Sequence, residues 1–425
     1  MKSIKKQRGI TLIALAVTIV VILILAGVTI DAVFSENGII NKAKEAADIM
    51  NDLVKEDEAK LNELLNELNE TMDSNWNSNI EIPEENTIPE PDPKPPKLED
   101  TTGMQDETIK VEDEYGNKVT IPKGFEVVEE EGTTVPEGIV IQDKDKNQFV
   151  WIPVGRVYKD ASKTNYSDIQ LGRYTFNTTN GNPTLVQAAY TEENPRNYEQ
   201  SILLSNQYQE YKTRFSPDGI ASSGTNGLNA IAKDLADFVN SVRDNGGYYL
   251  GRYEASYGSG SSVADYKPLS QVSKATSFST STEGSLWNKV TQIDAAKISR
   301  NMYNNDSNVG VESDLVNSYA WDTAIVFIQA MGNGNENYAN KGSVNSSLAN
   351  TGTIGDEVCN IHDMASNCYE WSTEYSTLTG GSSAYPCVYR GGFYGDSGSC
   401  TAYRDYYRAT YKLSYGSFRL TLYVK

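Results

Sequence analysis

Residues 359–375 read CNIHDMASNCYEWSTEY, and residues 385–425 read YPCVYRGGFYGDSGSCTAYRDYYRATYKLSYGSFRLTLYVK. This C-terminal stretch holds all 4 cysteines of the 425-residue chain and its single histidine, His362. Tyrosines are dense in it as well. The residues that could catalyse a reaction or bind a ligand or metal are therefore expected in this stretch first.

The net charge of the chain is strongly negative, at -20. A nucleic-acid backbone or an anionic lipid surface is bound by clustered Lys and Arg that replace its counterions, so neither is expected as a partner. Most of the excess acid lies between Asp31 and Asp145, which indicates a solvated, self-repelling stalk. Length and uneven composition together predict a membrane or stalk part followed by one large globular part.

The N-terminus carries four basic residues within Met1–Arg8, followed by an uncharged run from Ile10 to Ile30. As a helix this run would be about 31 Å long, enough to cross a bilayer core of about 30 Å. The basic leader and Asp31 predict a cytoplasmic N-terminus and an extracellular remainder. A cleavable secretory signal is the alternative, but its apolar core is usually shorter, about 7–15 residues.

The junction KQRGITLI, residues 6–13, resembles the prepilin leader of type IV pilins and type II secretion pseudopilins. The resemblance implies a leader over 1–9, a membrane helix over 10–30, and cleavage between Gly9 and Ile10 by a prepilin peptidase, with methylation of the new N-terminus. That family usually has Glu at the fifth mature position, where this chain has Ala14. It therefore implies a minor pilus or pseudopilus subunit, or a pilin-like anchor; an ordinary membrane anchor remains the alternative.

Two segments separate the membrane helix from the globular part. Residues 31–75 keep an apolar stripe that predicts an amphipathic stalk helix. Residues 76–107 form an acidic, Pro-rich linker, whose core IPEENTIPEPDPKPPK spans residues 82–97. Repeated proline favours polyproline II, so this core predicts a semi-rigid spacer on the order of 50 Å long.

Residues 108–425 predict an α+β domain of many short strands and few helices. Helical periodicity appears at Gly227–Arg243 and again at Asp314–Met331. The polar stretches 164–223 and 257–285 are expected to be surface insertions.

Three motifs in order, DMASNCYEW (363–371), VYRGGF (388–393) and SFRL (417–420), resemble motifs of the formylglycine-generating enzyme (sulfatase-modifying factor) family. Earlier segments, FVWIPV from Phe149, YLGRYE from Tyr249 and WNKVT from Trp287, are similar to that family too. The resemblance covers about residues 138–425 and is strongest over 138–155 and 246–425. It implies a C-type-lectin-like fold, with the DMASN and YRGG strands side by side.

The same resemblance does not carry the enzyme's chemistry. The oxidase members hold copper(I) with two cysteines after the RGG motif, whereas this chain offers Cys400 alone beside Tyr394-Gly395-Asp396, and one sulfur with a carboxylate does not make a soft two-thiolate site. Relatives that use three histidines as iron ligands are excluded by the single His362. A Ser/His/Asp triad at His362 remains formally open. We therefore expect a non-catalytic protein, with a copper-dependent oxidase as the alternative.

The resemblance further implies uses for the cysteines and for one asparagine. Extracellular cysteines tend to be oxidised, and four allow three pairings. The side-by-side strands favour Cys359 with Cys387 and Cys368 with Cys400; a reactive Cys400 thiol is the alternative. Asn367 matches a residue that helps to bind a structural Ca²⁺ in the family, although Ser366 replaces the usual Gly. Apart from this Ca²⁺, no cofactor is expected.

Residues 394–415 combine Tyr with Ser, Gly and Asp, which is the composition of antibody combining sites. They are also similar to the variable region of proteins diversified by diversity-generating retroelements, whose targets end in the same lectin-like fold. The expected function is that of an adhesin-like protein on the cell surface or pilus, which contacts a protein or glycan. The alternative is that these tyrosines line the core, while Arg390, Arg404 and Arg419 are expected to be scaffold. The candidate contact residues are Tyr394, Asp396, Ser397, Ser399, Tyr403, Asp405, Tyr406, Tyr407, Tyr411 and Tyr415.

Overall fold

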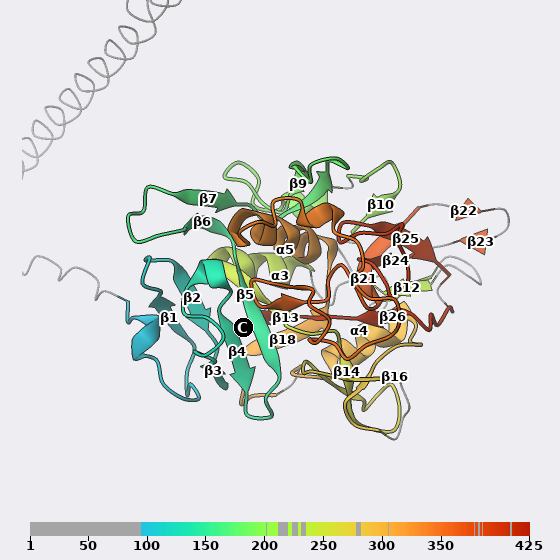
Figure 1. The fold of residues 1–425 in the computed structure, drawn as a ribbon, viewed down its shortest axis with the longest axis horizontal. Helices are drawn as coiled ribbons and strands as arrows, with labels where there is room; N and C mark the ends of the chain where they lie inside the picture. The colour runs from blue at the N-terminus through green and yellow to red at the C-terminus, as the bar shows by residue number, and fades with distance from the viewer. Residues whose placement is uncertain are drawn as a thin grey trace, which may run out of the picture. The chain divides into compact units, whose positions relative to one another are not determined.

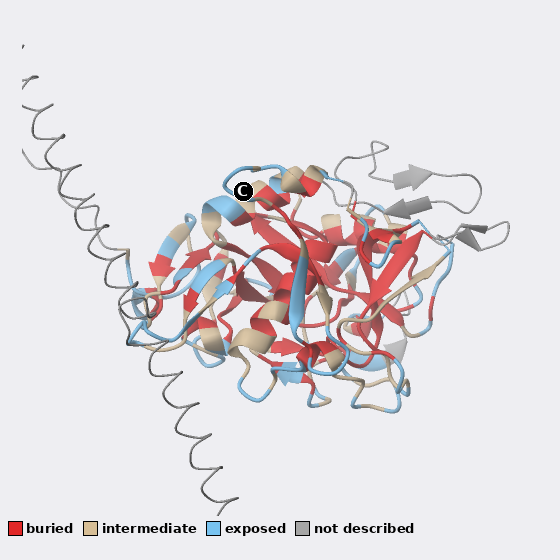
Figure 2. Ribbon diagram, turned by 90° about the horizontal axis from the view of Figure 1, so that it is seen from above, coloured by how far each residue is buried: buried red, intermediate tan, exposed pale blue. Residues whose placement is uncertain are grey.

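An antiparallel six-stranded sheet forms the centre of the computed structural model (Figure 1). Three of its inner strands are buried along nearly their whole length, mostly through apolar and aromatic side chains, and Figure 2 shows buried strands through the interior of the domain. In spatial order the strands are β18 (Val311–Leu315), β27 (Leu420–Val424), β13 (Gly247–Gly251), β5 (Gln148–Pro153), β4 (Val140–Asp143) and β3 (Phe125–Val127).

The structure describes residues 95–425 except 201, 211–219, 223–227, 231–234, 278–281, 305, 378, 381–382, 385 and 409. These residues belong to one unit that spans Pro91–Lys425. The predicted leader, membrane helix, stalk and most of the linker, including Gly9 and Ile10, lie outside the described residues. Within the described part of the chain, no helix is both long enough and apolar enough to cross a membrane.

Three α-helices accompany this sheet: α3 (Leu235–Asn245), α4 (Gln292–Arg300) and α5 (Ser318–Met331). The Asn317 side chain caps α5 by accepting a 2.9 Å hydrogen bond from the Ala320 amide. Helix α5 begins four residues later than the predicted start at Asp314. Asp314 belongs to β18 and pairs with Thr421. Helix α4 was not predicted.

A second sheet brings the C-terminal motifs together. Its strands are β10 (Tyr208–Gln209), β21 (Tyr369–Ser376), β24 (Cys387–Arg390), β25 (Arg404–Tyr407) and β26 (Gly416–Phe418). Strand β24 lies antiparallel between β21 and β25, and β26 runs parallel to β21. The expected side-by-side placement of the DMASN and YRGG strands is therefore confirmed.

A four-stranded sheet, short two-stranded sheets and 3-10 turns make up the remainder of the described residues, so the domain is of the α+β class with more sheet than helix. The prediction that 164–223 is a surface insertion is wrong in part, because Arg173 is fully buried and β10 joins the second sheet. The remaining elements are η1 (Leu98–Asp100), β1 (Ile109–Glu112), β2 (Lys118–Ile121), η2 (Val135–Glu137), β6 (Gly155–Tyr158), β7 (Tyr166–Ile169), β8 (Gly172–Phe176), β9 (Pro183–Ala188), η3 (Asn197–Glu199), β11 (Ile220–Ser222), β12 (Leu228–Ala230), β14 (Ser256–Ser259), β15 (Lys267–Leu269), β16 (Lys274–Ser277), β17 (Ser285–Leu286), η5 (Tyr338–Asn340), β19 (Glu357–Val358), β20 (Ile361–His362), β22 (Thr379–Gly380) and β23 (Ser383–Ala384).

Candidate functional site

The two glycines of the RGG turn let the chain pass directly over the DMAS segment. Gly391 has φ +80°, and a Cβ at this position would lie 2.6 Å from the Met364 carbonyl oxygen. A Cβ on Gly392 would collide with the Ala365 carbonyl. Only glycine allows this approach, which sets the start of the tyrosine-rich stretch against the end of the DMASN motif.

A buried ionic network holds β24 and β25 from one side. Arg390 Nη2 lies 2.7 Å from Asp322 Oδ1, and Arg404, its cross-strand partner, pairs with Asp322 as well. Glu374 Oε2 accepts from Arg404 Nε at 3.1 Å, and its Oε1 lies 3.3 Å from Arg173 Nη2. The arginines are thereby neutralised inside the domain.

Arg419 has the same structural role elsewhere in the domain. It makes a bidentate pair with the buried Glu370 and donates to the His362 carbonyl oxygen at 2.7 Å. The full burial of Arg390 and Arg419, and the ion pairs of the 9 % exposed Arg404 side chain, agree with the expected scaffold role of these three arginines.

The opposite face of β24 and β25 carries tyrosines whose hydroxyls point at two carboxylates. Tyr389 donates to Asp405 Oδ2 at 2.8 Å, and Tyr403 donates to the same oxygen at 3.3 Å. Tyr369 donates to Asp396 Oδ2 at 2.9 Å. Because strand residues alternate between faces, Asp405 and Tyr407 share this side, whereas Arg404 and Tyr406 face the other.

Ring contacts connect these tyrosines into one layer. The Tyr369 ring lies 4.4 Å from that of Tyr389, 4.8 Å from that of Phe393 and 6.1 Å from that of Tyr403. Phe393 stacks on Tyr415 at 4.4 Å. Tyr369 and Tyr389 are 5 % and 6 % exposed, so they form the floor of the layer.

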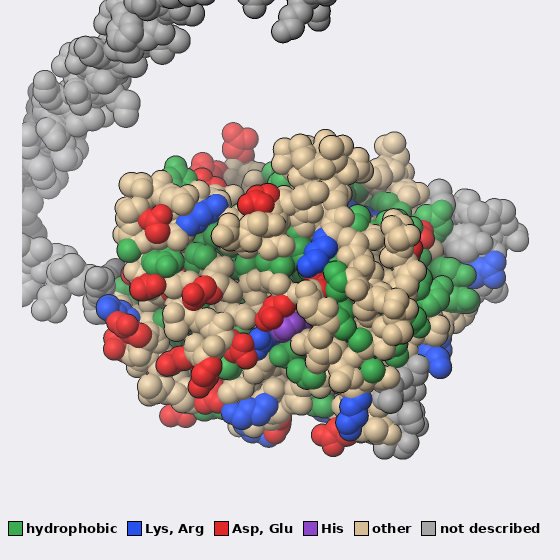
Figure 3. Space-filling model, in the orientation of Figure 1, with side chains coloured by type: hydrophobic (Ala, Val, Ile, Leu, Met, Phe, Trp, Pro, Cys, Tyr) green, Lys and Arg blue, Asp and Glu red, His purple; other side chains and the backbone are tan. Residues whose placement is uncertain are grey.

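The outer rings are more accessible. Tyr407 and Tyr411 stack at 4.0 Å, and Tyr411 is 42 % exposed. In Figure 3 the part of the visible surface over β24, β25 and β26 carries green side chains. We define the tyrosine face by its residues: Tyr394, Asp396, Ser397, Tyr403, Asp405, Tyr407, Tyr411 and Tyr415.

Asp396 organises the loop that borders this face. Its Oδ1 accepts from the Gly398 amide at 2.8 Å, and Oδ2 accepts from the hydroxyls of Tyr369 and Ser399. Burial alone would raise the pKa of Asp396, but the hydrogen bonds from Ser399, Gly398 and Tyr369 outweigh it and hold this pKa below its usual value. The carboxylate is therefore ionised at neutral pH.

Two of the ten candidate residues do not belong to the tyrosine face. Ser399 is 3 % exposed and acts inside the loop. Tyr406 packs on the other side of β25, against a small cluster that includes Tyr208 and Val388. The alternation of a strand explains its position, because the ring that follows Asp405 must leave the side that Asp405 occupies.

The Asn367 side chain is held by hydrogen bonds. Its Oδ1 accepts from the Ala349 amide at 3.0 Å, and its Nδ2 donates to Glu254 Oε2 at 2.5 Å. Among the described residues, no group of three or more His, Cys, Asp or Glu side chains is placed to hold a metal ion. The Asn367 side chain thereby joins the segments that carry Ala349 and Glu254.

The predicted disulfides are absent: all four cysteines, which lie within the described residues, are thiols. Cys359 is in the tight turn between β19 and β20, and its carbonyl lies against Gly138, which precedes β4 of the first sheet. Cys387 is in the second sheet, where it pairs with Tyr375 and Tyr407. A disulfide needs Cα atoms within about 7 Å. The prediction assumed that neighbouring strands also bring their flanking cysteines together.

Burial shifts the pKa values of Cys400 and His362. Burial raises the pKa of Cys400 above its usual value, which disfavours the thiolate. His362 stacks on Tyr253 with ring centres 4.9 Å apart. Burial, together with Arg252 and Arg419, lowers the pKa of His362 to about 3, so the imidazole is a weak base.

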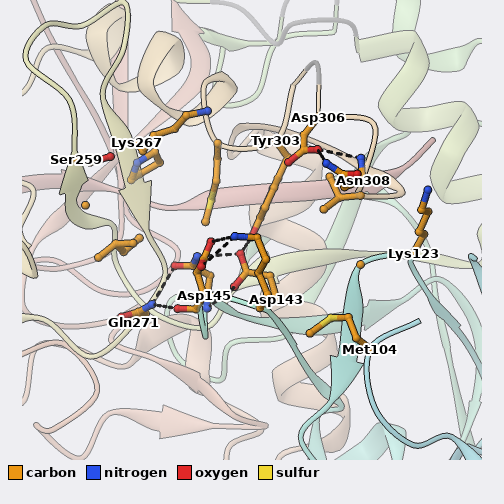
Figure 4. A pocket seen from close by; sticks show the side chains of 18 of the residues that line it. Met104, Lys123, Asp143, Asp145, Ser259, Lys267, Gln271, Tyr303, Asp306 and Asn308 are labelled. Carbon is orange, nitrogen blue, oxygen red and sulfur yellow. Dashed lines mark hydrogen bonds and ion pairs between the residues drawn. The ribbon is translucent and has the colours of Figure 1, made fainter. Parts of the chain in front are cut away.

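A separate cavity of about 890 Å³ lies between the β3–β4 side of the first sheet and the β14–β15 hairpin (Figure 4). Tyr303 donates to Asp143 Oδ2 at 2.6 Å in its wall. Charges of both signs line it, among them Lys123, Lys267 and Asp306. No residue of the tyrosine face lines this cavity, and sequence reasoning missed it because its walls come from segments far apart in the chain.

No family model and no curated protein matches this chain. Among solved structures, CarF is similar with a TM-score of 0.31 and 14% identity, over 42% of this chain and 87% of that one. PvdO from Pseudomonas aeruginosa has a TM-score of 0.28 and 10% identity, over 42% of this chain and 82% of that one. Similarities this distant do not support a functional assignment, so the function is inferred from the residues of this chain.

Proposed function

We propose that the protein is a surface-displayed, adhesin-like binding protein that recognises a protein or glycan ligand through the tyrosine face. The observation that carries the proposal is the stacked pair Tyr407–Tyr411 at an accessible edge of a rigid aromatic layer. Tyrosine gives large contact area at low entropic cost, and a layer already held by hydrogen bonds loses little freedom on binding.

The finer assignments belong to the same proposal. The domain is a C-type-lectin-like fold of the sulfatase-modifying-factor type, similar to retroelement-diversified proteins. The predicted membrane helix holds it outside the cell membrane, after cleavage by a prepilin peptidase. The adjacency of the DMASN and YRGG strands supports the fold part of this proposal.

The copper-dependent oxidase is the second candidate for this chain, and one titration separates it from the binding protein. Stoichiometric copper(I) binding that disappears in Cys400→Ser would favour the oxidase. The raised pKa of Cys400 supports the opposite outcome, because copper(I) binds the thiolate. A minor pilin remains a third candidate; it predicts recovery of the protein in sheared fibres.

Selection from libraries tests the binding proposal. The full chain is panned against a random-peptide library and a glycan array, in parallel with Tyr407→Ala/Tyr411→Ala. Ligands are expected that bind the unmodified chain and not the double variant. Tyr166→Ala is the matched control, because Tyr166 is an equally exposed tyrosine (44 %) on β7. Ligands that bind all three proteins equally would refute the proposal.

A further inference from the structure

The tyrosine face has an unequal supply of hydrogen-bond donors and acceptors. The hydroxyls of Tyr403, which belongs to the face, and of the floor residues Tyr369 and Tyr389 all donate their protons to Asp396 or Asp405. The outward lone pairs of these hydroxyls and the carboxylates are acceptors. This part of the face therefore offers a ligand mainly acceptors and the faces of aromatic rings.

The arginines and the surface carboxylates near β25 lie on opposite sides of this strand. Arg390 and Arg404 lie on the far side, where Asp322 and Glu374 pair with them. Asp396 and Asp405 lie on the near side, and both carboxylates are close enough to Tyr403 to raise its pKa, which burial and these charges bring to about 12. The near side is thus negative, although the strand itself contains arginine.

Asp405 retains capacity for a further donor, whereas the hydrogen bonds to Asp396 fill its acceptor positions. An ionised carboxylate has about four lone-pair positions, and Asp405 accepts three hydrogen bonds, from Tyr389, Tyr403 and the Tyr406 amide. Asp396 is about half-buried and accepts from Gly398, Ser399 and Tyr369, with a further backbone contact from Ser399. The charge of both groups remains uncancelled, because none of these donors is a cation.

We propose that the tyrosine face recognises a basic peptide segment, and that a lysine or arginine side chain of this segment pairs with Asp405 while its stem lies on the tyrosine rings. This inference rests on the proposed function and names the ligand class. A cation supplies donors to the part of the face around Asp405, and aromatic faces attract it further. A neutral glycan needs donors as well as acceptors from its site.

Two cations at the border of the tyrosine face affect where a basic ligand binds. Arg408 and Lys412 are exposed and follow Tyr407 and Tyr411 in the chain. Arg408 acts on Tyr407 electrostatically, so its charge is close to the stacked pair. A basic ligand is therefore expected to bind toward Asp405, and removal of a border cation should strengthen its binding.

Fluorescence anisotropy with two labelled peptides tests the inference on the full chain. The probes are (Gly-Lys)6 and (Gly-Glu)6, and the variants are Asp405→Asn, Lys412→Glu and the control Asp168→Asn. Asp168 is an exposed carboxylate that pairs with Arg156 on the β6–β7 hairpin, so its variant makes the same change in net charge elsewhere. Urea unfolding verifies that each variant is folded.

The lysine peptide is expected to bind more tightly than the glutamate peptide. Asp405→Asn should weaken it about three- to tenfold, Asp168→Asn less than about twofold, and Lys412→Glu should strengthen it about threefold. Equal loss in Asp405→Asn and Asp168→Asn, or no gain in Lys412→Glu, overturns the inference. If panning instead yields glycans or acidic peptides that need Tyr407 and Tyr411, the binding function stands and only the ligand class is wrong.

Discussion

The Tyr389 hydroxyl donates a 2.8 Å hydrogen bond to Oδ2 of Asp405, its direct partner across the β24–β25 pair. Tyr389 is 6 % exposed and belongs to the core, whereas Asp405 is partly exposed. The core thus determines where a surface carboxylate points. The geometry of the tyrosine face depends on such links between floor and surface.

Tyr389→Phe should lower the stability of the domain by about 1–2 kcal/mol, because a buried hydroxyl that bonds to a charged group is lost. Urea unfolding of the full chain, followed by tryptophan fluorescence, measures the change. Tyr403→Phe is the matched control: its hydroxyl bonds to the same oxygen at 3.3 Å from a more exposed ring, so the loss should be smaller. Equal losses of stability in the two variants would show that the hydrogen bond from Tyr389 contributes no more than the one from Tyr403.

Gly391→Ala should be strongly destabilising, by about 3 kcal/mol or more, because left-handed backbone strain of about 1–2 kcal/mol adds to a collision. Its Cβ would lie 2.6 Å from the Met364 carbonyl oxygen. Gly395→Ala is the control, since Gly395 has a similar φ of +76° and its nearest contact is at 3.4 Å. A shift in the thermal midpoint that is the same for both variants would contradict the close approach of the RGG turn to the DMAS segment.

Glu210→Gln should stabilise the protein at alkaline pH. Glu210 accepts from the Ser318 amide at 2.8 Å and from Thr373 Oγ1 at 2.7 Å, and burial raises its pKa from 4.5 to about 7. The folded state therefore holds this proton more tightly than the unfolded state. The stability that it contributes is fully present below pH 4.5 and is lost as the pH rises through about 7.

Glutamine mimics the protonated form, so the variant should be more stable than the unmodified protein at pH 8, by about 1–3 kcal/mol, and nearly equal to it at pH 4.5. Urea midpoints at the two pH values give the difference. The exposed Glu129→Gln should show no such trend. A Glu210→Gln protein that is less stable at pH 8 would reverse the sign of the argument.

Thiol counting tests the state of the cysteines. Burial raises the pKa of Cys359 to about 12 and raises that of Cys368 and Cys387 as well. Iodoacetamide at pH 7.5 should therefore label the native protein slowly, whereas the denatured protein, without reductant, should gain four labels by mass spectrometry. Cys400→Ser should gain three. If the denatured protein gains no labels, the cysteines are oxidised and the predicted disulfides are present.

Much of the strand framework could be predicted from the sequence, because apolar runs such as Phe149–Val154 mark buried strands. The motifs at 363–371 and 388–393 also predicted a strand pair that the structure contains. Helix α4 escaped detection because polar Gln292 and Ser299 occupy buried positions of a nine-residue helix, which blurs its apolar periodicity.

The composition of residues 394–415 indicated a surface rich in tyrosine but could not tell which rings point outward. Tyr406 and Tyr407 are neighbours of the same type, and only the register of β25 against β24 separates them. The floor residue Tyr369 was missed, since it comes from β21 and meets Phe393 and Tyr403 only in the folded domain.

The central claim, that the tyrosine face binds a ligand while the layer beneath it supports the fold, is tested most directly by pairing a binding titration with an unfolding curve. The full chain and Tyr407→Ala/Tyr411→Ala are titrated with a ligand selected by the unmodified chain, beside the Tyr166→Ala control. We expect at least about tenfold weaker binding in the double variant only, with a stability change below about 1 kcal/mol. Unchanged affinity, or loss of binding that accompanies a collapse in stability, would contradict the claim.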